Sequence, residues 1–117
     1  KMPASGEFRR SLQILVNLIG NAIRYSPDGS VISLSVSADQ GFARISVSDQ
    51  GSGIAEEDQE RIFEKFERLG RSGDGGSGLG LFISRRLARA MGGSLAVESA
   101  ADQGSTFTLS LPARKTP

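Results

Sequence analysis

Three polar residues at helical spacing are the first candidates for chemistry in this chain of 117 residues. Asn17, Asn21 and Arg24 would share one face of a helix. Amide oxygens are hard ligands that suit magnesium, and a nearby cation suits a phosphate group. The same spacing also describes an ordinary polar stripe on an amphipathic helix. The stripe alone therefore leaves a ligand site and a solvated face both open.

A carboxylate beside two glycines is the second candidate. Asp49 follows an apolar run and precedes Gly51 and Gly53. The carboxylate could accept a hydrogen bond from an amino group, and the glycines would let a flat ligand approach the backbone. The alternative is a turn in which Asp49 accepts from a local backbone N–H.

A glycine-rich stretch, residues 70–80, is the third candidate, and its last part runs into a predicted helix. Backbone N–H groups at a helix N-terminus bind anions, and glycine permits close approach of phosphate oxygens. A flexible loop explains the earlier glycines. It does not explain the later ones, because a glycine within a helix costs about 1 kcal/mol relative to alanine. A P-loop is excluded because the Lys–Ser/Thr ending is missing.

Composition removes several classes of chemistry. The chain has no histidine and no cysteine, which excludes disulfides, thiol catalysis, zinc–thiolate sites and a Ser-His-Asp arrangement. The net charge of +1 lacks the basic excess of a nucleic-acid binder, so we interpret Arg85, Arg86 and Arg89 as a solvated helix face. No apolar run approaches the roughly 20 residues that span a bilayer. We expect no nucleic-acid partner, no direct membrane contact, and a fragment of a longer protein.

The elements that position these residues follow from hydrophobic periodicity. Helices are predicted over 7–25, 56–66 and 79–91, and strands over 31–37, 42–48, 95–99 and 106–111. The strands form hairpins, which favours antiparallel pairing. The predicted fold is therefore α+β: a two-layer sandwich with a mixed, mostly antiparallel sheet packed on three helices. A Rossmann fold is excluded, since no strand–helix–strand crossover surrounds the glycines.

Burial follows from the same periodicity. The strand near residue 34 is predicted to be half-buried, because Ile32, Leu34 and Val36 alternate with serines. Gly92 and Gly93 are predicted to cap the last helix. In the short middle helix, core packing explains Phe63, whereas Phe66 is better placed to anchor a lid. The first helix is predicted to bury a face made of Phe8, Leu12, Leu15, Ile19, Ala22 and Ile23, away from the polar stripe.

In this order and spacing, the motifs resemble the catalytic, ATP-binding domain of bacterial sensor histidine kinases. The resemblance covers nearly the whole chain. It implies a Bergerat-type fold with residues 1–117 as one domain and residues 68–78 as a flexible ATP lid. Residues 13–27 resemble the N box of that family, 49–54 the G1 box, 61–68 the F box, 76–81 the G2 box, and 104–107 the start of its usual last strand.

The resemblance also implies roles for individual residues. Asp49 should accept from the adenine amino group, partly through water, and Thr106 lies on the strand expected beside it. Asn21 should ligate Mg²⁺ with Asn17 adjacent, and Arg24 should face the phosphates; these three are the implied catalytic set. Arg68 or Arg71 is the candidate to reach the γ-phosphate. The other residues implied to contact the nucleotide are Tyr25, Gly51, Gly53, Ile54, Phe66, Ser77, Gly78, Leu79, Gly80 and Leu81.

The implied function is transfer of the γ-phosphoryl group of Mg-ATP to a histidine on a separate dimerisation and phosphoacceptor domain, with a response regulator downstream. The chain would be a cytoplasmic domain of a parent that could be anchored in the inner membrane. Hydrolysing relatives in the superfamily carry a Glu where this chain has Asn17, and an amide cannot accept a proton as a carboxylate does. Gln50 stands where Thr is common, which could alter a water contact. The alternatives are a degenerate regulatory module that binds nucleotide or a partner, and an anti-sigma-type serine kinase.

Overall fold

The computed structural model describes residues 5–64, 80–100 and 103–112. The predicted lid at 68–78 lies outside the described residues, as do the side chains of Phe8 and Tyr25. The elements are helix α1 (Ser5–Tyr25), strands β1 (Ser33–Asp39) and β2 (Phe42–Asp49), 3-10 turns η1 (Glu56–Asp58) and η2 (Arg61–Phe63), helix α2 (Gly80–Ala90), and strands β3 (Ser94–Ser99) and β4 (Ser105–Pro112).

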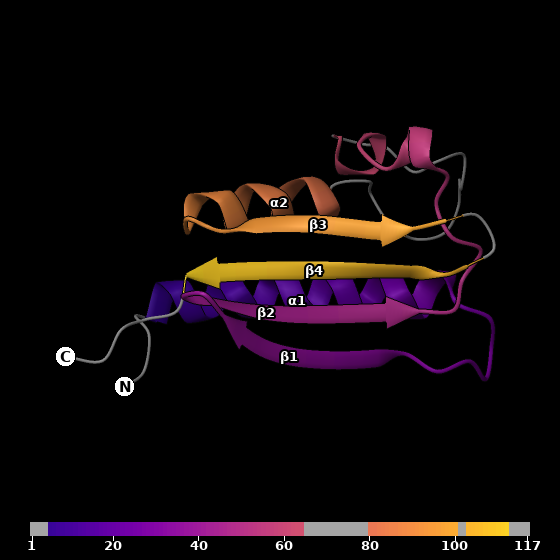
Figure 1. The fold of residues 1–117 in the computed structure, drawn as a ribbon, viewed down its shortest axis with the longest axis horizontal. Coiled ribbons are helices and arrows are strands. Elements are labelled where there is room, and N and C mark those ends of the chain that lie inside the picture. The colour runs from indigo at the N-terminus through magenta and orange to yellow at the C-terminus, as the bar shows by residue number, and fades with distance from the viewer. Residues whose placement is uncertain (1–4, 65–79, 101–102, 113–117) are drawn as a thin grey trace.

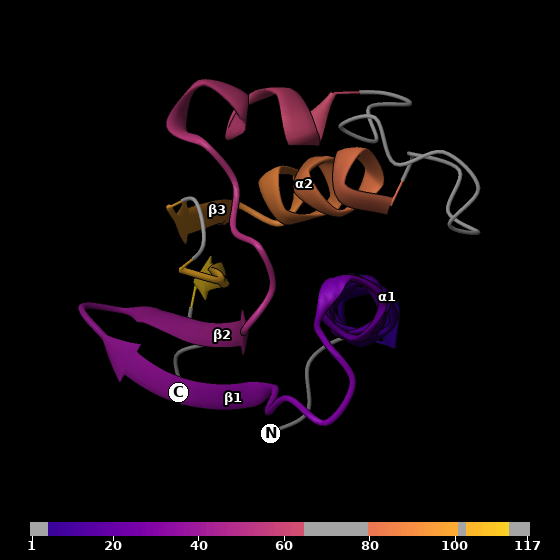
Figure 2. The ribbon, with the colours of Figure 1, turned by 90° about the vertical axis from the view of Figure 1, so that its right-hand side faces the viewer.

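The four described strands form one antiparallel sheet in the order β1-β2-β4-β3. Helices α1 and α2 lie side by side on one face of this sheet, and β1 lies at the edge beside α1 (Figures 1 and 2). The predicted two-layer α+β architecture is therefore confirmed. No helix in the described part of the chain is long and apolar enough to cross a membrane.

The core lies between the two helices and the three strands β2, β4 and β3. From α1 it takes Ile14, Leu18 and Ala22, spaced four residues apart so that they line one helix face. The other buried apolar residues are Val47, Ile62, Phe63, Ala88, Leu95, Phe107 and Leu109. Phe63 meets Phe107 edge to face, with ring centroids 6.3 Å apart, which confirms its predicted place in the core.

The predicted burial of α1 is partly wrong. Leu12 and Ile23 are 45% and 63% exposed, whereas Ile14 and Leu18, which the prediction left out, are fully buried. Apolar residues occur on more than one side of this helix, so periodicity alone cannot decide which side faces the sheet. Packing against β2 and α2 makes that choice.

The predicted half-burial of the first strand holds for Ile32, which lies just before β1 and packs against the core, but it is wrong for Leu34 and Val36. The register of β1 places Leu34 opposite Val47 and Val36 opposite Ile45, so these side chains do lie on the helix-covered face of the sheet. They are nevertheless 53% and 75% exposed. The strand stands at the edge of the sheet, and the helices pack over its neighbours instead.

The middle helix predicted over 56–66 is realised as the two 3-10 turns η1 and η2. Residue Glu64 is already extended after η2, so the described part of this segment never forms an α-helical turn. A long-range tie holds it in place. The side-chain amide of Gln59 donates to the backbone oxygens of Ile54 and Ser99, at 3.0 and 2.8 Å.

Two glycines fix local structure, one just after α2 and the other just before β4. Gly92 has φ +81°, and Gly93 N–H donates to the Ala88 oxygen at 2.9 Å, so the predicted cap of α2 is confirmed and takes the form of a Schellman motif. Gly104 has φ +75°, and a Cβ there would lie 2.2 Å from the backbone oxygen of Asp49. The β3–β4 connection can therefore press against the end of β2 only because residue 104 is glycine.

Candidate nucleotide-binding site

Those predicted site residues that the structure describes lie on elements that meet toward one end of the molecule. There the C-terminal half of α1, the end of β2, the start of β4 and the start of α2 meet, at the right of Figure 1. Asp49 is the last residue of β2, and Gly80 is the first of α2. Sequence positions 17 to 24, 49 to 54 and 80 thus come together from separate parts of the chain.

Asp49 is half-buried and orients its carboxylate through a local bond. The N–H of Gly51 donates to its Oδ1 at 2.8 Å. This is the turn that the sequence offered as an alternative to a ligand contact. The two interpretations are compatible, because a carboxylate has a second oxygen that can still accept.

The strand that carries Thr106 does lie beside Asp49, as predicted, but a different residue of that strand stands directly opposite Asp49. Ser105 is the cross-strand partner of Asp49, while Thr106 is the partner of Ser48. The hydroxyls of Thr106 and Ser48 are bonded at 2.8 Å, on the sheet face opposite to buried Phe107. Sequence reasoning missed Ser105, which counting by twos from Phe107 would have placed on the inner face.

The loop after Asp49 is anchored to the sheet at several points. Gly53 has φ +80°, a conformation that glycine adopts without strain. The N–H of Ile54 donates to Ser99 Oγ at 2.7 Å. Gln50 accepts from the N–H of Val31 at 3.1 Å. Gln50, which stands where the resemblance leads us to expect Thr, therefore ties the loop to the chain just before β1.

Asn17 joins the two helices. Its amide nitrogen Nδ2 donates to Ser84 Oγ at 2.9 Å and lies 3.4 Å from the Gly80 oxygen. The predicted polar stripe therefore does not simply face solvent opposite the core, because its first member faces α2. Together these two contacts hold the N-terminal part of α2, with its free N–H groups, against α1.

The rest of the stripe lies toward the C-terminal end of α1. Arg24 is exposed, and its Nη1 donates to Asn21 Oδ1 at 3.1 Å. A cation, an amide oxygen and the start of α2 are thus arranged along one end of the helix pair. A helix N-terminus and an arginine both favour phosphate, and an amide oxygen can serve Mg²⁺.

Magnesium would depend on this amide rather than on a carboxylate cage. No group of three or more His, Cys, Asp or Glu side chains in the described ranges could hold a metal ion. That donor set fits Mg²⁺, which is often bound through few protein ligands, several waters and substrate phosphates. Of the other predicted contacts, Phe66, Arg68, Ser77, Gly78 and Leu79 lie outside the described residues, as does the side chain of Tyr25.

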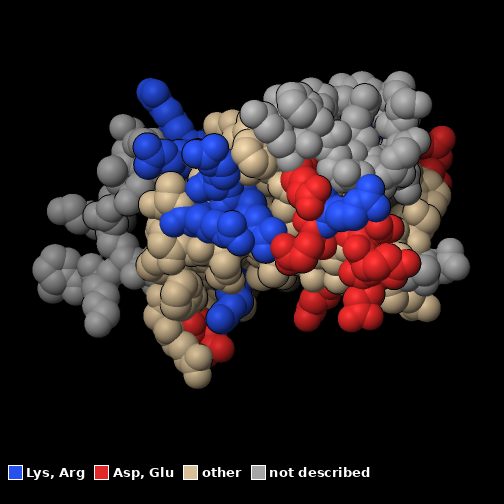
Figure 3. Space-filling model, turned by 90° about the horizontal axis from the view of Figure 1, so that it is seen from above, with Lys and Arg blue, Asp and Glu red and all other residues tan. Residues whose placement is uncertain are grey.

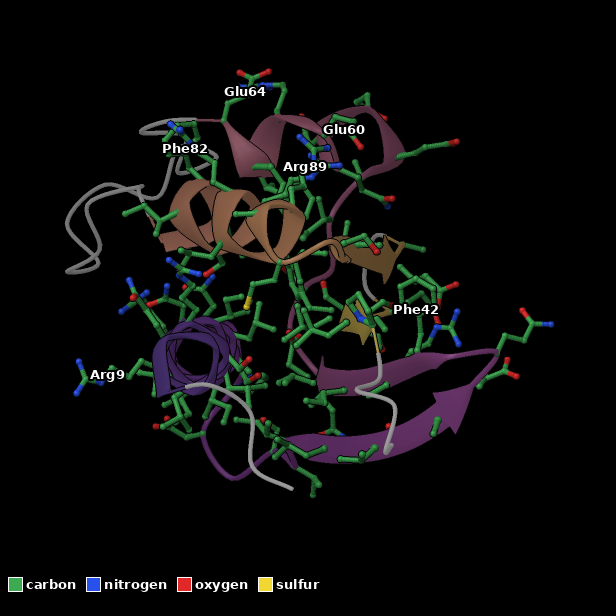
Figure 4. The ribbon with its side chains drawn as sticks, turned by 90° about the vertical axis from the view of Figure 1, so that its left-hand side faces the viewer. Arg9, Phe42, Glu60, Glu64, Phe82 and Arg89 are labelled. Atoms are coloured by element: carbon green, nitrogen blue, oxygen red, sulfur yellow. The ribbon has the colours of Figure 1, made fainter. Side chains whose placement is uncertain are left out.

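The arginine cluster on α2 is only partly the solvated face that the sequence suggested. Arg85 pairs with Glu60 at 3.0 Å, and its guanidinium lies 4.2 Å from the Phe63 ring centroid. The hydrogen bond and charge of Arg85, with a further effect from Arg89, lower the pKa of Glu60 below its usual value. Figure 3 shows basic and acidic side chains gathered on adjoining parts of this face, and Figure 4 shows Glu60 and Arg89 on neighbouring elements.

Comparison with known proteins gives one family. The family described as "Histidine kinase-, DNA gyrase B-, and HSP90-like ATPase" matches residues 6–115. Over 102 residues the chain is 49% identical to the sensor-like histidine kinase SenX3 of Mycobacterium tuberculosis H37Rv, covering 85% of this chain and 25% of SenX3. It is 48% identical over 102 residues to the sensor histidine kinase AruS of Pseudomonas aeruginosa, covering 81% of this chain and 10% of AruS. The chain thus spans about a quarter or less of these relatives.

Solved structures agree in fold. Full-length ShkA in complex with AMPPNP superposes with a TM-score of 0.80 at 38% identity, covering 92% of this chain and 22% of ShkA. The mycobacterial sensor histidine kinase MprB gives a TM-score of 0.77 at 31% identity, covering 89% of this chain and 70% of that structure.

Proposed function

Because this chain belongs to the family of histidine kinase-, DNA gyrase B- and HSP90-like ATPases, we propose that it binds Mg-ATP and donates the γ-phosphoryl group to a histidine on a separate domain. The observation that carries this proposal is that one site combines a group that suits the adenine base with groups that suit Mg²⁺ and phosphate. A carboxylate that can accept from an amino group lies at the end of β2. An amide oxygen, an arginine and a helix N-terminus lie at the helix pair.

The adenine end is built on β2 and the loop after it. The second oxygen of Asp49 would accept from the adenine amino group. Gly51, Gly53 and Ile54 would lie along the base, because the loop that carries them is tied to the sheet. ShkA, at 38% identity, was solved with AMPPNP, an ATP analogue, which supports nucleotide binding by this fold.

The phosphate end is built on α1 and α2. Asn21 would hold Mg²⁺ through its amide oxygen, which accepts from Arg24 in this structure and would be released as Arg24 turns to the phosphates. Asn17 would keep the start of α2 in place. Arg24 and the first N–H groups of α2, at Gly80 and Leu81, would face phosphate oxygens. When bound, Mg²⁺ neutralises charge on the phosphates. Tyr25, Phe66, Arg68, Ser77, Gly78 and Leu79 complete the proposed contacts.

The acceptor must come from elsewhere, because the chain contains no histidine. In the transfer, the bond between the γ-phosphorus and its bridging oxygen breaks, a phosphorus–nitrogen bond to the imidazole forms, and ADP leaves. Such transfer depends mainly on positioning and charge neutralisation, so this chain need supply only the nucleotide site. The proposed partners are a dimerisation and phosphoacceptor domain and, downstream, a response regulator, in the cytoplasm.

Calorimetric titration with a non-hydrolysable ATP analogue and Mg²⁺ tests the nucleotide site. Wild type should bind in the micromolar to millimolar range, and Asp49→Asn should lose at least tenfold in affinity. The matched control is Asp39→Asn, the same change at an exposed acid whose carboxylate pairs with Arg44 at 3.6 Å. Equal affinity of wild type and Asp49→Asn would refute the adenine contact.

Phosphotransfer is tested by adding a histidine-containing phosphoacceptor domain and labelled ATP. We expect acid-labile label on that domain and none on this chain alone. Binding without transfer to the acceptor domain of the chain's own parent would instead favour the degenerate regulatory module. Label on a serine of a candidate substrate would favour the serine-kinase alternative.

A further inference from the structure

Three polar residues form one row across the inner face of the sheet at the adenine end. Ser105 on β4 is the cross-strand partner of Asp49 on one side and of Ser99 on the other. The next row inward is apolar, since Val47, Phe107 and Val97 are paired in the same way. The hydroxyl of Ser105 thus lies between the residue that carries the Asp49 carboxylate, at the end of β2, and Ser99 on β3. Ser105 is only 7% exposed.

The hydrogen bonds of Ser99 determine the direction of the Ser105 hydroxyl. Ser99 Oγ donates its one proton to the Gly104 oxygen at 2.7 Å and accepts from the N–H of Ile54 at 2.7 Å. Ser99 and Ser105 oxygens are also bonded, at 2.9 Å. Because the Ser99 proton is already used, Ser105 must be the donor in that bond. The Ser105 oxygen is then left as an acceptor only.

From this we infer that Ser99, which contacts no ligand itself, is a specificity-determining residue that restricts the base to one with a 6-amino group. The inference rests on the proposed nucleotide site. Because Ser105 donates its proton to Ser99, Ser105 and Asp49 present only hydrogen-bond acceptors to the base, either directly or through water. An amino group carries two protons and matches two acceptors, whereas the 6-oxo group of hypoxanthine or guanine matches neither.

Ser99 also positions the loop that would line the base. It holds the N–H of Ile54, while Gln59 Nε2 holds the Ile54 oxygen at 3.0 Å and the Ser99 oxygen at 2.8 Å. Both sides of one peptide segment are thus tied to the β3–β4 hairpin. Ser99 therefore helps to fix both the position of the loop that carries Ile54 and the direction of the Ser105 hydroxyl.

The test compares affinities for non-hydrolysable analogues of ATP and ITP in wild type, Ser99→Ala and Ser99→Thr. In Ser99→Ala the Ser105 proton is freed and can turn toward a 6-oxo group. We expect the ratio of ATP to ITP affinity to fall about fivefold, the worth of one ordinary hydrogen bond. Ser99→Thr keeps the hydroxyl and should restore the ratio. In the nucleotide-free protein, amide hydrogen exchange at Ile54 should accelerate in Ser99→Ala only.

The matched control is Ser46→Ala, which removes another hydroxyl from the same sheet. Ser46 is bonded to Thr108 at 3.0 Å on the opposite face, so its loss should change stability without changing the ratio. Equal weakening of both nucleotides by Ser99→Ala, with a melting-temperature loss like that of Ser46→Ala, would overturn the inference while leaving the ATP site intact. A wild-type chain that binds neither nucleotide would refute the proposed function and the inference with it.

Discussion

The bond between Asn17 and Ser84 offers a direct test of how α1 holds α2. The two atoms are 2.9 Å apart, and Ser84 is fully buried. Asn17→Ala removes the donor to Ser84. The orphaned hydroxyl can turn to the Gly80 oxygen, the backbone acceptor one helical turn earlier, so its burial penalty is largely avoided. The expected loss is therefore that of one net hydrogen bond, about 1 kcal/mol of unfolding free energy.

A double-mutant cycle isolates this interaction. Ser84→Ala should also lose about 1 kcal/mol, because Asn17 keeps the Gly80 oxygen within reach at 3.4 Å. Because the two side chains share one hydrogen bond, the double variant should be more stable than the sum of the single losses predicts, by about 1 kcal/mol. Urea denaturation of wild type and the three variants gives the three changes in unfolding free energy, and each kcal/mol should appear as roughly 4 °C in melting temperature.

The same variants connect stability to the site. The Ser84 side chain is fully buried, so it cannot touch nucleotide, yet its bond holds the start of α2. A fewfold loss of Mg-nucleotide affinity in Ser84→Ala is therefore expected from displacement of the helix N-terminus. Strict additivity, within about 0.3 kcal/mol, would show that the two side chains do not interact and would refute the argument.

Three further perturbations test the fold around the site. Gly104→Ala should lose at least about 2 kcal/mol, because the residue has positive φ and its new Cβ would meet a backbone oxygen at 2.2 Å; near-wild-type urea stability would contradict this. Val36→Ser should change stability by less than about 0.5 kcal/mol, whereas Val47→Ser on the covered strand should lose at least about 2 kcal/mol; similar losses would mean that β1 is covered. The Glu60 pKa, followed by NMR titration, should rise toward its ordinary value of 4.5 in Arg85→Gln; in wild type the ion pair stabilises the fold above that value, and the benefit is lost as pH falls through the lowered pKa. An unchanged pKa would show that Arg85 is not its cause.

Local signals made the hairpins and the end of α2 predictable from the sequence. A glycine with positive φ stops α2 at Gly92, and Gly41 has the same conformation in the β1–β2 turn. Such turns are encoded by a few adjacent residues, so they need no knowledge of the rest of the chain. The order of elements around the site follows from them.

Contacts between distant residues were not predictable. Which stripe of α1 is buried depends on where β2 and α2 lie, so Leu12 was misplaced. The middle segment forms 3-10 turns with Gln59 bonded to Ser99, a residue 40 positions away. The partner of Asn17 is 67 positions away. Only Ser105 was within reach of sequence reasoning, by strand parity.

An amide at position 17 has a structural reason as well as a chemical one. Asn17 Nδ2 donates to Ser84, and the Gly80 oxygen lies 3.4 Å from the same nitrogen. A carboxylate has no proton to offer that oxygen and would place a negative charge beside the proposed phosphate end. The residue that fastens α2 to α1 thereby also leaves position 17 without a group that could activate water. The site is proposed to hold ATP until an external imidazole arrives. A firmly held N-terminus of α2 would keep the triphosphate bound, and the absence of a carboxylate at position 17 would slow its hydrolysis, so both effects of Asn17 preserve ATP for transfer.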